Sequence, residues 1–235
     1  MNFKFFIIPM QLFITDFEKK WESIKISDIE ILSQVRKVLR MKIWDTFFVQ
    51  NGNTRYKLEI SDWDDKNIFW KILESIEHPK QIDEIWITIA MSNKRDKMET
   101  IVQKLSEIWI KNIFFRPSER SIIRERNEKK LDRLNKIAKE AIEQSRWRQL
   151  PKITFEKDIS KIIEWKEVIV FDKSESNFKN IWTIKNALWI IWPEWGLTEN
   201  DYKKFWEKIK TVSLGDTVLR TETASIIAAR YLKNF

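Results

Sequence analysis

The chain has 235 residues and a formal net charge of +8, from 43 Lys and Arg against 35 Asp and Glu. It contains no cysteine, which excludes a disulfide scaffold, a thiolate metal site and a cysteine nucleophile and suits a reducing compartment. The positive charge favours a nucleic-acid partner, although many basic proteins bind none.

Apolar runs in the chain are short. The run at residues 3–8 is interrupted by Pro9, so the start of the chain is not expected to act as a signal peptide. No run of 18 apolar residues occurs, which predicts no membrane-spanning helix and no membrane partner. We therefore expect a cytoplasmic protein.

Residues 1–80 are predicted to form a β-rich first domain. Asn51-Gly52 is a strong hairpin signal. Ser27 and Glu30 form a capping-box pattern, which predicts a helix from there to about Leu39. Short strands around one helix predict a small β-barrel. The expected strands are residues 3–8, 46–50, 54–60 and 67–72.

The pattern changes after Pro79, a residue that favours a linker there. From residue 84, apolar strands alternate with amphipathic helices, which predicts an α/β domain with a parallel sheet over residues 81–235. The expected strands are residues 85–90, 112–115, 168–171 and 187–191. The expected helices are residues 94–108, 127–144, 158–164, 199–209 and 221–232.

Several common catalytic sites have no support in the sequence. Neither G-x-G-x-x-G nor G-x-x-x-x-G-K-[ST] is present, so no Rossmann-type or P-loop site is expected. His78 is the only histidine, so a Ser-His-Asp triad would depend on one residue of the linker. No metal-ligand spacing stands out, and no metal is predicted.

Two loops near the end of the chain carry the strongest motifs. The first reads Trp192-Pro193-Glu194-Trp195-Gly196-Leu197-Thr198 and follows the apolar strand at 187–191. The second, residues 213–224, reads S-L-G-D-T-V-L-R-T-E-T-A. A further loop, residues 172–175, follows the strand at 168–171. Because open α/β sheets bind ligands beyond the carboxyl ends of their strands, these loops predict a ligand site.

Together these motifs resemble the cofactor loops of the RsmE family, within the SPOUT superfamily of knotted RNA methyltransferases. That family's first loop reads G-P-E-G-G-[FL]-[ST] and its second reads L-G-x-x-[IV]-L-R-x-E-T-A. The second loop here matches throughout, and the first matches except that Trp192 and Trp195 stand where the family has glycine. The resemblance covers nearly the whole chain and is weakest over residues 1–37.

The resemblance implies a trefoil-knotted, parallel-sheet SPOUT domain preceded by a PUA-like RNA-binding barrel. It implies S-adenosyl-L-methionine as cofactor and the 16S rRNA of the small ribosomal subunit as partner. The implied reaction is N3-methylation of a uridine (1498 in rRNA numbering). It also implies a homodimer that uses the terminal helix; the alternative is that this helix packs only on its own sheet. That helix offers Ile226, Ile227, Ala229 and Tyr231 as interface candidates.

The resemblance further implies roles for individual residues. Arg220, Glu222 and Arg120 are the candidate catalytic residues. Arg220 would place positive charge near a uracil oxygen, whereas Glu222 is at least as well explained as a helix-capping residue, and the general base is not identified. The cofactor-binding candidates are Trp192, Pro193, Glu194, Trp195, Gly196, Leu214, Gly215, Val218, Leu219 and Thr223. The RNA-binding candidates are Arg40, Lys94, Arg95, Arg116, Gln144, Arg146 and Arg148.

The helix expected at residues 127–144 carries cations interleaved with carboxylates. This pattern is typical of a solvated helix face, and we interpret it in that way. Its cations are Lys129, Lys130, Arg133, Lys136 and Lys139.

Two other functions stay open. The chain would act as a different SPOUT methyltransferase if its target were a ribose hydroxyl or a tRNA. It would be a non-catalytic RNA-binding or assembly protein of the same fold if Trp192 and Trp195 block the cofactor pocket.

Tryptophan and glycine occur in unusual numbers. There are 13 Trp and only 3 Gly, against a typical glycine content of about 7%. Trp44, Trp63 and Trp109 stand, like Trp192 and Trp195, where the resemblance or the turn composition leads us to expect glycine. We hypothesise that these are UGA codons that the source organism reads as glycine and that have been translated as Trp. The alternative is an aromatic-rich core.

Overall fold

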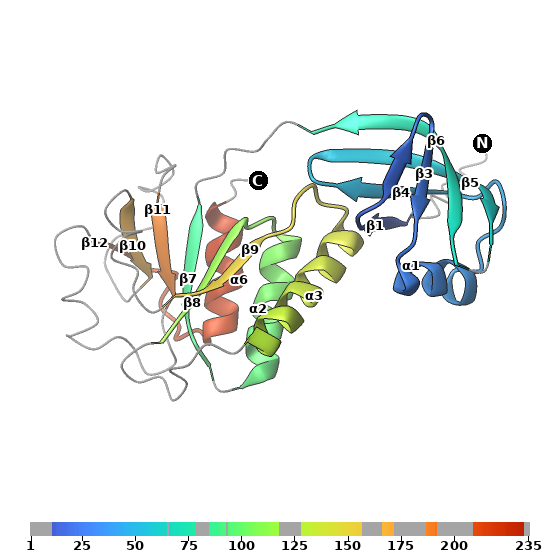
Figure 1. Cartoon of the computed structure of the whole chain (residues 1–235). Coiled ribbons are helices and arrows are strands. Elements are labelled where there is room, and N and C mark those ends of the chain that lie inside the picture. The colour runs from blue at the N-terminus through green and yellow to red at the C-terminus, as the bar shows by residue number, and fades with distance from the viewer. Residues whose placement is uncertain are drawn as a thin grey trace, which may run out of the picture. The chain divides into compact units, whose positions relative to one another are not determined.

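The chain forms two compact units (Figure 1). Unit 1 comprises Met1–Gln81 and Glu143–Arg148, and unit 2 comprises Ile82–Ile142 and Gln149–Phe235. The structure, a computed structural model, describes residues 11–64, 66–78, 85–92, 94–117, 128–156, 166–171, 187–191 and 209–232. The strand expected at residues 3–8 and the helix expected at 158–164 lie outside these ranges.

Unit 1 is built on a six-stranded sheet in the order β1-β4-β5-β6-β3-β2. β1 pairs with β4 in parallel, and the other pairs are antiparallel. Gly52, with a φ of 57°, lies in the turn between β4 and β5, so the predicted hairpin is confirmed. The strands are β1 (Leu12–Ile14), β2 (Glu18–Lys20), β3 (Ser23–Ile26), β4 (Thr46–Asn51), β5 (Thr54–Trp63) and β6 (Ile68–Glu77).

Aromatic rings fill the centre of unit 1. Phe47 and Trp70 are fully buried, with their ring centroids 4.0 Å apart, and Phe13 packs edge-on against Phe47 at 5.4 Å. Alternate residues of a strand face the same side, so one face of the sheet carries these rings. Burying a Phe side chain stabilises a fold by about 1.5–3 kcal/mol, which makes this cluster a principal source of stability in unit 1.

A short helix, α1 (Ile29–Ser33), continues into a π-helical turn, η1 (Gln34–Val38). Its N-cap is Asp28, whose Oδ1 accepts hydrogen bonds from the backbone N–H of Glu30 at 2.9 Å and of Ile31 at 3.3 Å. The prediction that Ser27 caps this helix was therefore wrong by one residue. Ser27 instead hydrogen-bonds Asn67 at 3.2 Å, so its hydroxyl has a different partner.

Unit 2 is built on a six-stranded sheet in the order β12-β10-β11-β7-β8-β9, and every pairing is parallel. The predicted parallel α/β architecture is confirmed. β9 and β12 were not predicted from the sequence. Ile209 was expected to end a helix, but it is the first residue of β12. The strands are β7 (Trp86–Ala90), β8 (Asn112–Arg116), β9 (Lys152–Phe155), β10 (Glu167–Phe171), β11 (Ala187–Ile191) and β12 (Ile209–Val212).

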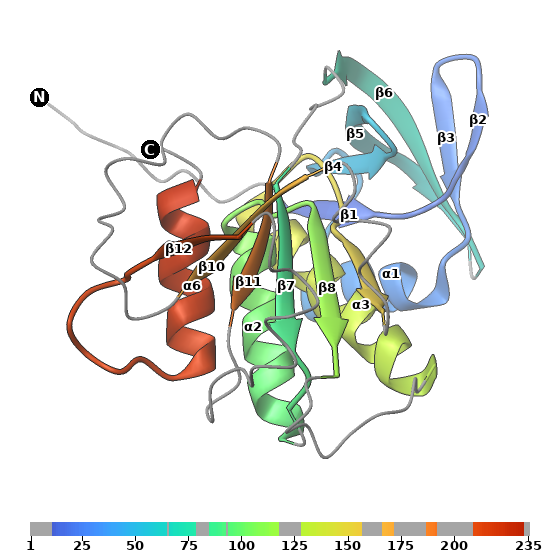
Figure 2. The same ribbon diagram turned by 90° about the vertical axis from the view of Figure 1, so that its left-hand side faces the viewer.

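Among the described residues of unit 2, three helices pack on one face of this sheet (Figure 2). They are α2 (Arg95–Glu107), α3 (Glu128–Ser145) and α6 (Thr221–Leu232), and α6 has the predicted bounds. Their buried side chains share one core with alternate strand residues such as Ile87 and Trp189, whereas Leu188 faces the opposite side. Ala229 belongs to this core with none of its surface exposed, so its prediction as an interface residue was wrong.

Three of the tryptophans that the structure describes adopt the left-handed backbone region. Their φ angles are 52° at Trp21, 79° at Trp44 and 74° at Trp109. In this region the β-carbon crowds the following carbonyl oxygen, which costs about 1–2 kcal/mol for a residue other than glycine. Trp21 and Trp44 are 96% and 73% exposed, so little packing offsets this cost. Trp70, by contrast, is fully buried and has no such φ.

Trp109 ends α2 in a Schellman motif. The N–H of Ile110 donates to the Leu105 carbonyl at 2.9 Å, and the N–H of Trp109 donates to the Ser106 carbonyl at 3.0 Å. The left-handed position of this motif is usually glycine. Ile110 and Leu105 lie in the same buried cluster, as the apolar residues of the motif commonly do. The motif therefore supports glycine at position 109.

Trp44 and Trp21 lie in two tight turns. Trp44 is the third residue of a turn closed by the N–H of Asp45 donating to the Lys42 carbonyl at 3.0 Å, and a positive φ there marks a type II turn. Trp21 is the first of two turn residues between β2 and β3, where a positive φ favours glycine. Only Trp44 was singled out from the sequence.

Trp63 does not share this conformation. It lies in β5 without a left-handed φ, and the Arg36 guanidinium lies over its ring at 5.6 Å. The structure therefore does not support glycine at this position. Trp192 and Trp195 lie outside the described residues.

We expect Trp21→Gly and Trp44→Gly each to raise the free energy of unfolding by about 1 kcal/mol, because glycine adopts these φ angles without the steric cost. Trp70→Gly is the matched control, since the same exchange there removes a buried ring and should lower stability by about 3 kcal/mol or more. Denaturant unfolding of the three variants beside the unchanged chain measures both effects.

Equal destabilisation by all three exchanges would contradict this prediction.

The codons of the gene provide an independent test of the recoding hypothesis. We expect UGA at codons 21, 44 and 109 and UGG at codon 70, and UGG at codons 44 and 109 would refute the recoding hypothesis.

Candidate functional site

The loop between β12 and α6 lies at the carboxyl edge of the parallel sheet (Figure 2). Ser213 Oγ accepts from the Gly215 N–H and donates to the Gly215 carbonyl, both at 3.1 Å, which makes a tight turn. A β-carbon at Gly215 would meet no atom within 4 Å, so its φ of 119° is what requires glycine. Leu214 packs against the core and anchors this turn to unit 2.

The rest of this loop presents side chains at the surface. Val218 is 81% exposed and Arg220 is also exposed, whereas Leu219 and Thr223 are half-buried. The structure thus brings together the candidate residues of the second loop, with Arg220 immediately before α6. The first-loop candidates Trp192, Pro193, Glu194, Trp195 and Gly196, and the catalytic candidate Arg120, lie outside the described residues.

Glu222 in the first turn of α6 forms an ion pair with Lys97 of α2. The Lys97 Nζ lies 3.7 Å from Glu222 Oε2, and both side chains are more than four-fifths buried. The sequence did not predict this pair, because Lys97 and Glu222 lie far apart in the chain. The ion pair gives Glu222 a structural partner on α2, which favours a role in bracing the two helices over that of a general base.

Glu99 joins α2 to α3. Its carboxylate accepts from Arg133 Nε at 2.5 Å and Nη2 at 3.0 Å, and from Arg95 Nε at 2.6 Å. The hydrogen bonds from Arg133, and then those from Arg95, lower the pKa of Glu99 to about 2. Arg95, predicted to bind RNA, therefore also has a structural partner. Lys94, the N-cap of α2, makes no side-chain capping bond and is exposed.

Two other RNA-binding candidates lie in different surroundings. Arg116 ends β8 and is only 4% exposed, so the prediction that it presents its guanidinium to RNA was wrong. Arg40 is exposed and follows η1 with a φ of 51°. Arg116 is buried because β8 lies inside the sheet, between β7 and β9, and all of its residues are buried. The sequence pattern did not distinguish this strand from one at the edge of the sheet.

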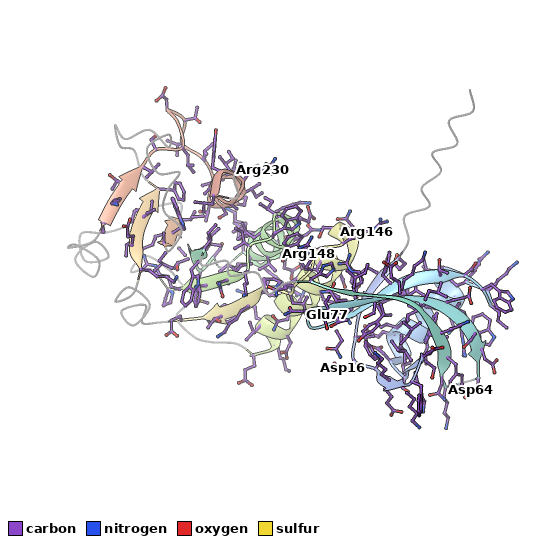
Figure 3. All side chains as sticks on the ribbon, turned by 90° about the horizontal axis from the view of Figure 1, so that it is seen from above. Asp16, Asp64, Glu77, Arg146, Arg148 and Arg230 are labelled. Atoms are coloured by element: carbon purple, nitrogen blue, oxygen red, sulfur yellow. The ribbon has the colours of Figure 1, made fainter. Side chains whose placement is uncertain are left out.

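Unit 1 contains a cluster of arginines around the segment after α3. Arg55 in β5 donates to the carbonyls of Arg146 and Trp147, both at 3.0 Å, and to Gln50 Oε1 at 2.9 Å. Figure 3 labels Arg146 and Arg148 in this segment. Burial, followed by the charges of Arg148 and Arg146, lowers the pKa of Arg55. Arg55 had no sequence signal, because it lies unmarked in a hairpin strand.

The same cluster affects the single histidine. Burial first, and then the charges of Arg55 and Arg148, lower the pKa of His78 below its ordinary value. His78 is therefore neutral at physiological pH, and its Nε2 is buried without a hydrogen-bond partner in the part of the chain that the structure describes. Gln144, the remaining RNA-binding candidate, is exposed near the end of α3.

Two kinds of feature are absent from the residues that the structure describes. No helix there is long and apolar enough to cross a membrane. No group of three or more His, Asp or Glu residues there is arranged to hold a metal ion.

Known proteins resemble this chain along most of its length. A family model described as an RNA methyltransferase domain matches residues 78–233. The ribosomal RNA small subunit methyltransferase E of Buchnera aphidicola is 33% identical over 221 residues, which cover 85% of this chain and 83% of that protein. The chain belongs to the ribosomal RNA small subunit methyltransferase E family.

Solved structures share the fold of this family member. The methyltransferase E of Neisseria gonorrhoeae, bound to S-adenosyl methionine, has a TM-score of 0.80 at 23% identity, covering 94% of this chain and 95% of that one. A putative methyltransferase of Legionella pneumophila has a TM-score of 0.81 at 23% identity, covering 95% and 97%. These likenesses confirm the predicted SPOUT fold with a separate β-rich N-terminal part.

The Glu99 contacts predict a pH dependence of stability in this methyltransferase E family member. A carboxyl whose folded pKa is about 2 stabilises the fold above its ordinary pKa of 4.5 and loses that contribution as pH falls toward 2. We expect Glu99→Gln to lower the free energy of unfolding by about 1 kcal/mol at pH 7, because solvent screens the partly exposed arginines. Denaturant unfolding between pH 7 and about pH 3 measures it.

Asp132→Asn on the exposed side of α3 is the control and should leave the pH profile unchanged. If Glu99→Gln lowers the free energy of unfolding by the same amount at every pH in this range, the low pKa of the Glu99 carboxyl is contradicted.

Proposed function

We propose that this chain transfers a methyl group from S-adenosyl-L-methionine to N3 of a uridine in 16S rRNA, at the position numbered 1498 in the rRNA. The main observation is the place of residues 213–222. In a member of this family, the loop that matches the cofactor motif begins at the carboxyl edge of a parallel sheet, where ligands bind. The name and the bound cofactor of the Neisseria gonorrhoeae protein support this assignment.

The described half of the proposed cofactor site fits S-adenosyl-L-methionine. Leu214, Gly215, Val218, Leu219 and Thr223 combine a tight glycine turn with exposed or half-buried small and apolar side chains. We propose that the backbone of this loop and of Trp192, Pro193, Glu194, Trp195 and Gly196 holds the cofactor without metal. The cofactor would supply an electrophilic methyl group.

We propose that Arg220 acts on the target base. Uracil N3 must lose its proton before it can accept a methyl group, and a fixed positive charge near O2 or O4 stabilises the resulting anion. Arg220 is exposed directly before α6 and its carbonyl accepts from the Ala224 N–H at 2.8 Å, which holds its backbone in place. Glu222, paired with Lys97, is assigned to bracing this position, and Arg120 to contact with the base or a phosphate.

We propose that residues 1–80 form a PUA-like RNA-binding domain and residues 81–235 the methyltransferase domain. The surface cations available for RNA phosphate are Arg40, Lys94, Arg95, Arg146 and Arg148, with Gln144 as a polar neighbour. Arginine and lysine of this kind position a nucleic acid without reading its sequence. Because ribosomal RNA is the substrate, we place this activity in the cytoplasm.

We expect replacement of Trp192 and Trp195 by glycine to strengthen cofactor binding about tenfold or more and to raise methylation. Overpacking a tight site costs about 1–3 kcal/mol for each large side chain, and 1.4 kcal/mol corresponds to a factor of ten. Calorimetry with S-adenosyl-L-methionine, with and without EDTA, measures binding. Mass mapping of 16S rRNA after reaction measures methylation and its position.

Arg220→Ala in the variant that carries glycine at positions 192 and 195 should retain cofactor binding and lose most of its turnover.

Loss of cofactor binding in EDTA would contradict a metal-free site. A modified ribose or tRNA would overturn the assigned substrate, and equal turnover of the tryptophan and glycine versions would contradict the predicted obstruction.

We propose that the protein is a homodimer that uses α6. Ile226 and Ile227 are half-buried and Tyr231 is 46% exposed, which leaves apolar surface on this helix after Ala228 and Ala229 pack inward. We expect light scattering at micromolar concentration to give about twice the 28.6 kDa of one chain. A monomer mass would contradict the proposal.

A further inference from the structure

A basic cavity lies between the first turns of α2 and α3. Its volume is about 340 Å³, and it is lined by Arg95, Glu99, Lys129, Lys130, Arg133 and Leu134. Four of these six residues are cations and one is a carboxylate. We propose that this cavity binds a backbone phosphate of the RNA substrate; the identity of that RNA as 16S rRNA rests on the proposed function.

Glu99 is the one carboxylate among the described residues that line the cavity. Its single negative charge is shared by Arg133, at 2.5 and 3.0 Å, and Arg95, at 2.6 Å. Lys129 and Lys130 line the same cavity. Burial, and then the charge of Arg95, lower the pKa of Lys130. Both effects disfavour the charged ammonium, and an anion bound in the cavity would stabilise it.

The helix ends add to the positive potential. The first N–H groups of a helix have no intrahelical acceptor and carry partial positive charge, so anions are favourable there and lysines are not. Lys129 and Lys130 nevertheless occupy the first turn of the 18-residue α3, and Arg95 opens the 13-residue α2. The acidic residues of those turns, Asp96 and Glu128, do not line the cavity. Such a local conflict is characteristic of functional sites.

The arginines are held in a geometry that suits phosphate. Glu99 engages Arg95 through Nε and Arg133 through Nε and Nη2. This leaves both Nη groups of Arg95 and the Nη1 of Arg133 for a second acceptor, and guanidinium groups bind phosphate oxygens through such paired N–H donors. The carboxylate thus fixes the two side chains and limits the rotational freedom that binding would otherwise remove.

The position of the cavity favours RNA as the source of the phosphate. α2 and α3 both begin at the edge where the strands of unit 2 end, the edge that also carries residues 213–220 (Figure 2). When the target base of an RNA binds at this edge, the neighbouring phosphates of that RNA lie near the first turns of α2 and α3. This revises the interpretation of the α3 cations as a solvated face: Lys129, Lys130 and Arg133 line a cavity, whereas Lys136 and Lys139 do not.

A matched pair of double variants tests the site. Lys129→Gln with Lys130→Gln removes two charges from the cavity, and Lys136→Gln with Lys139→Gln removes two charges from the same helix outside it. Filter binding of unmethylated 16S rRNA is measured over a range of salt concentrations. We expect the cavity variant to bind about tenfold more weakly and to lower the salt slope by about 0.7–0.9, the value for one lost phosphate contact. The control should change affinity less than about twofold.

Calorimetry with S-adenosyl-L-methionine and thermal unfolding verify that each variant is folded. If the cavity double variant does not fold, the single variant Lys129→Gln, at an exposed position, replaces it. Equal weakening by both double variants, or no weakening by the cavity variant, overturns the phosphate site. If the unchanged protein binds this RNA and the cofactor but does not methylate the RNA, the proposed function fails while the cavity result stands on its own.

Discussion

The parallel pairing of β11 with β7 is the constraint on which the arrangement of unit 2 depends. β11 enters between β7 and β10, so a strand from late in the chain takes a place inside the sheet rather than at its edge. Parallel pairing throughout brings all carboxyl ends to one edge. The turn at Ser213–Gly215 and the first turns of α2 and α6 can therefore meet, although long stretches of sequence separate them.

Helix α2 begins at that edge and makes ion pairs with the two other helices on this face of the sheet. Lys97 pairs with Glu222 of α6, and Glu99 pairs with Arg133 of α3. Residues two apart in a helix do not face the same way, so these two contacts leave α2 in different directions. With Met98 and Leu105 buried between them, the rotation of α2 about its own axis is fixed. The residues of the edge are thus held in place by both charge and packing.

The sequence predicted the long, periodic elements well and the short ones poorly. α2, α3 and α6 each repeat their apolar spacing over several turns, and β11 is apolar throughout. β2 consists of three charged residues and carries no alternation that a pattern could reveal. The loop at residues 213–220 was identified because its motif is contiguous. The Lys97–Glu222 pair and the Arg55 cluster were not, because each joins distant segments through tertiary structure alone.

The exposed indole at Trp21 has a consequence for how the polypeptide behaves in solution. β2 is an edge strand, and its residues Glu18, Lys19 and Lys20 are all exposed. Charged edge strands discourage pairing with other chains, which protects a sheet from aggregation. A large apolar ring at the tip of the same hairpin weakens that protection, and Trp44 adds a second exposed ring to unit 1. The choice between tryptophan and glycine at these turns thus also sets the colloidal stability of unit 1, through surfaces remote from any cofactor.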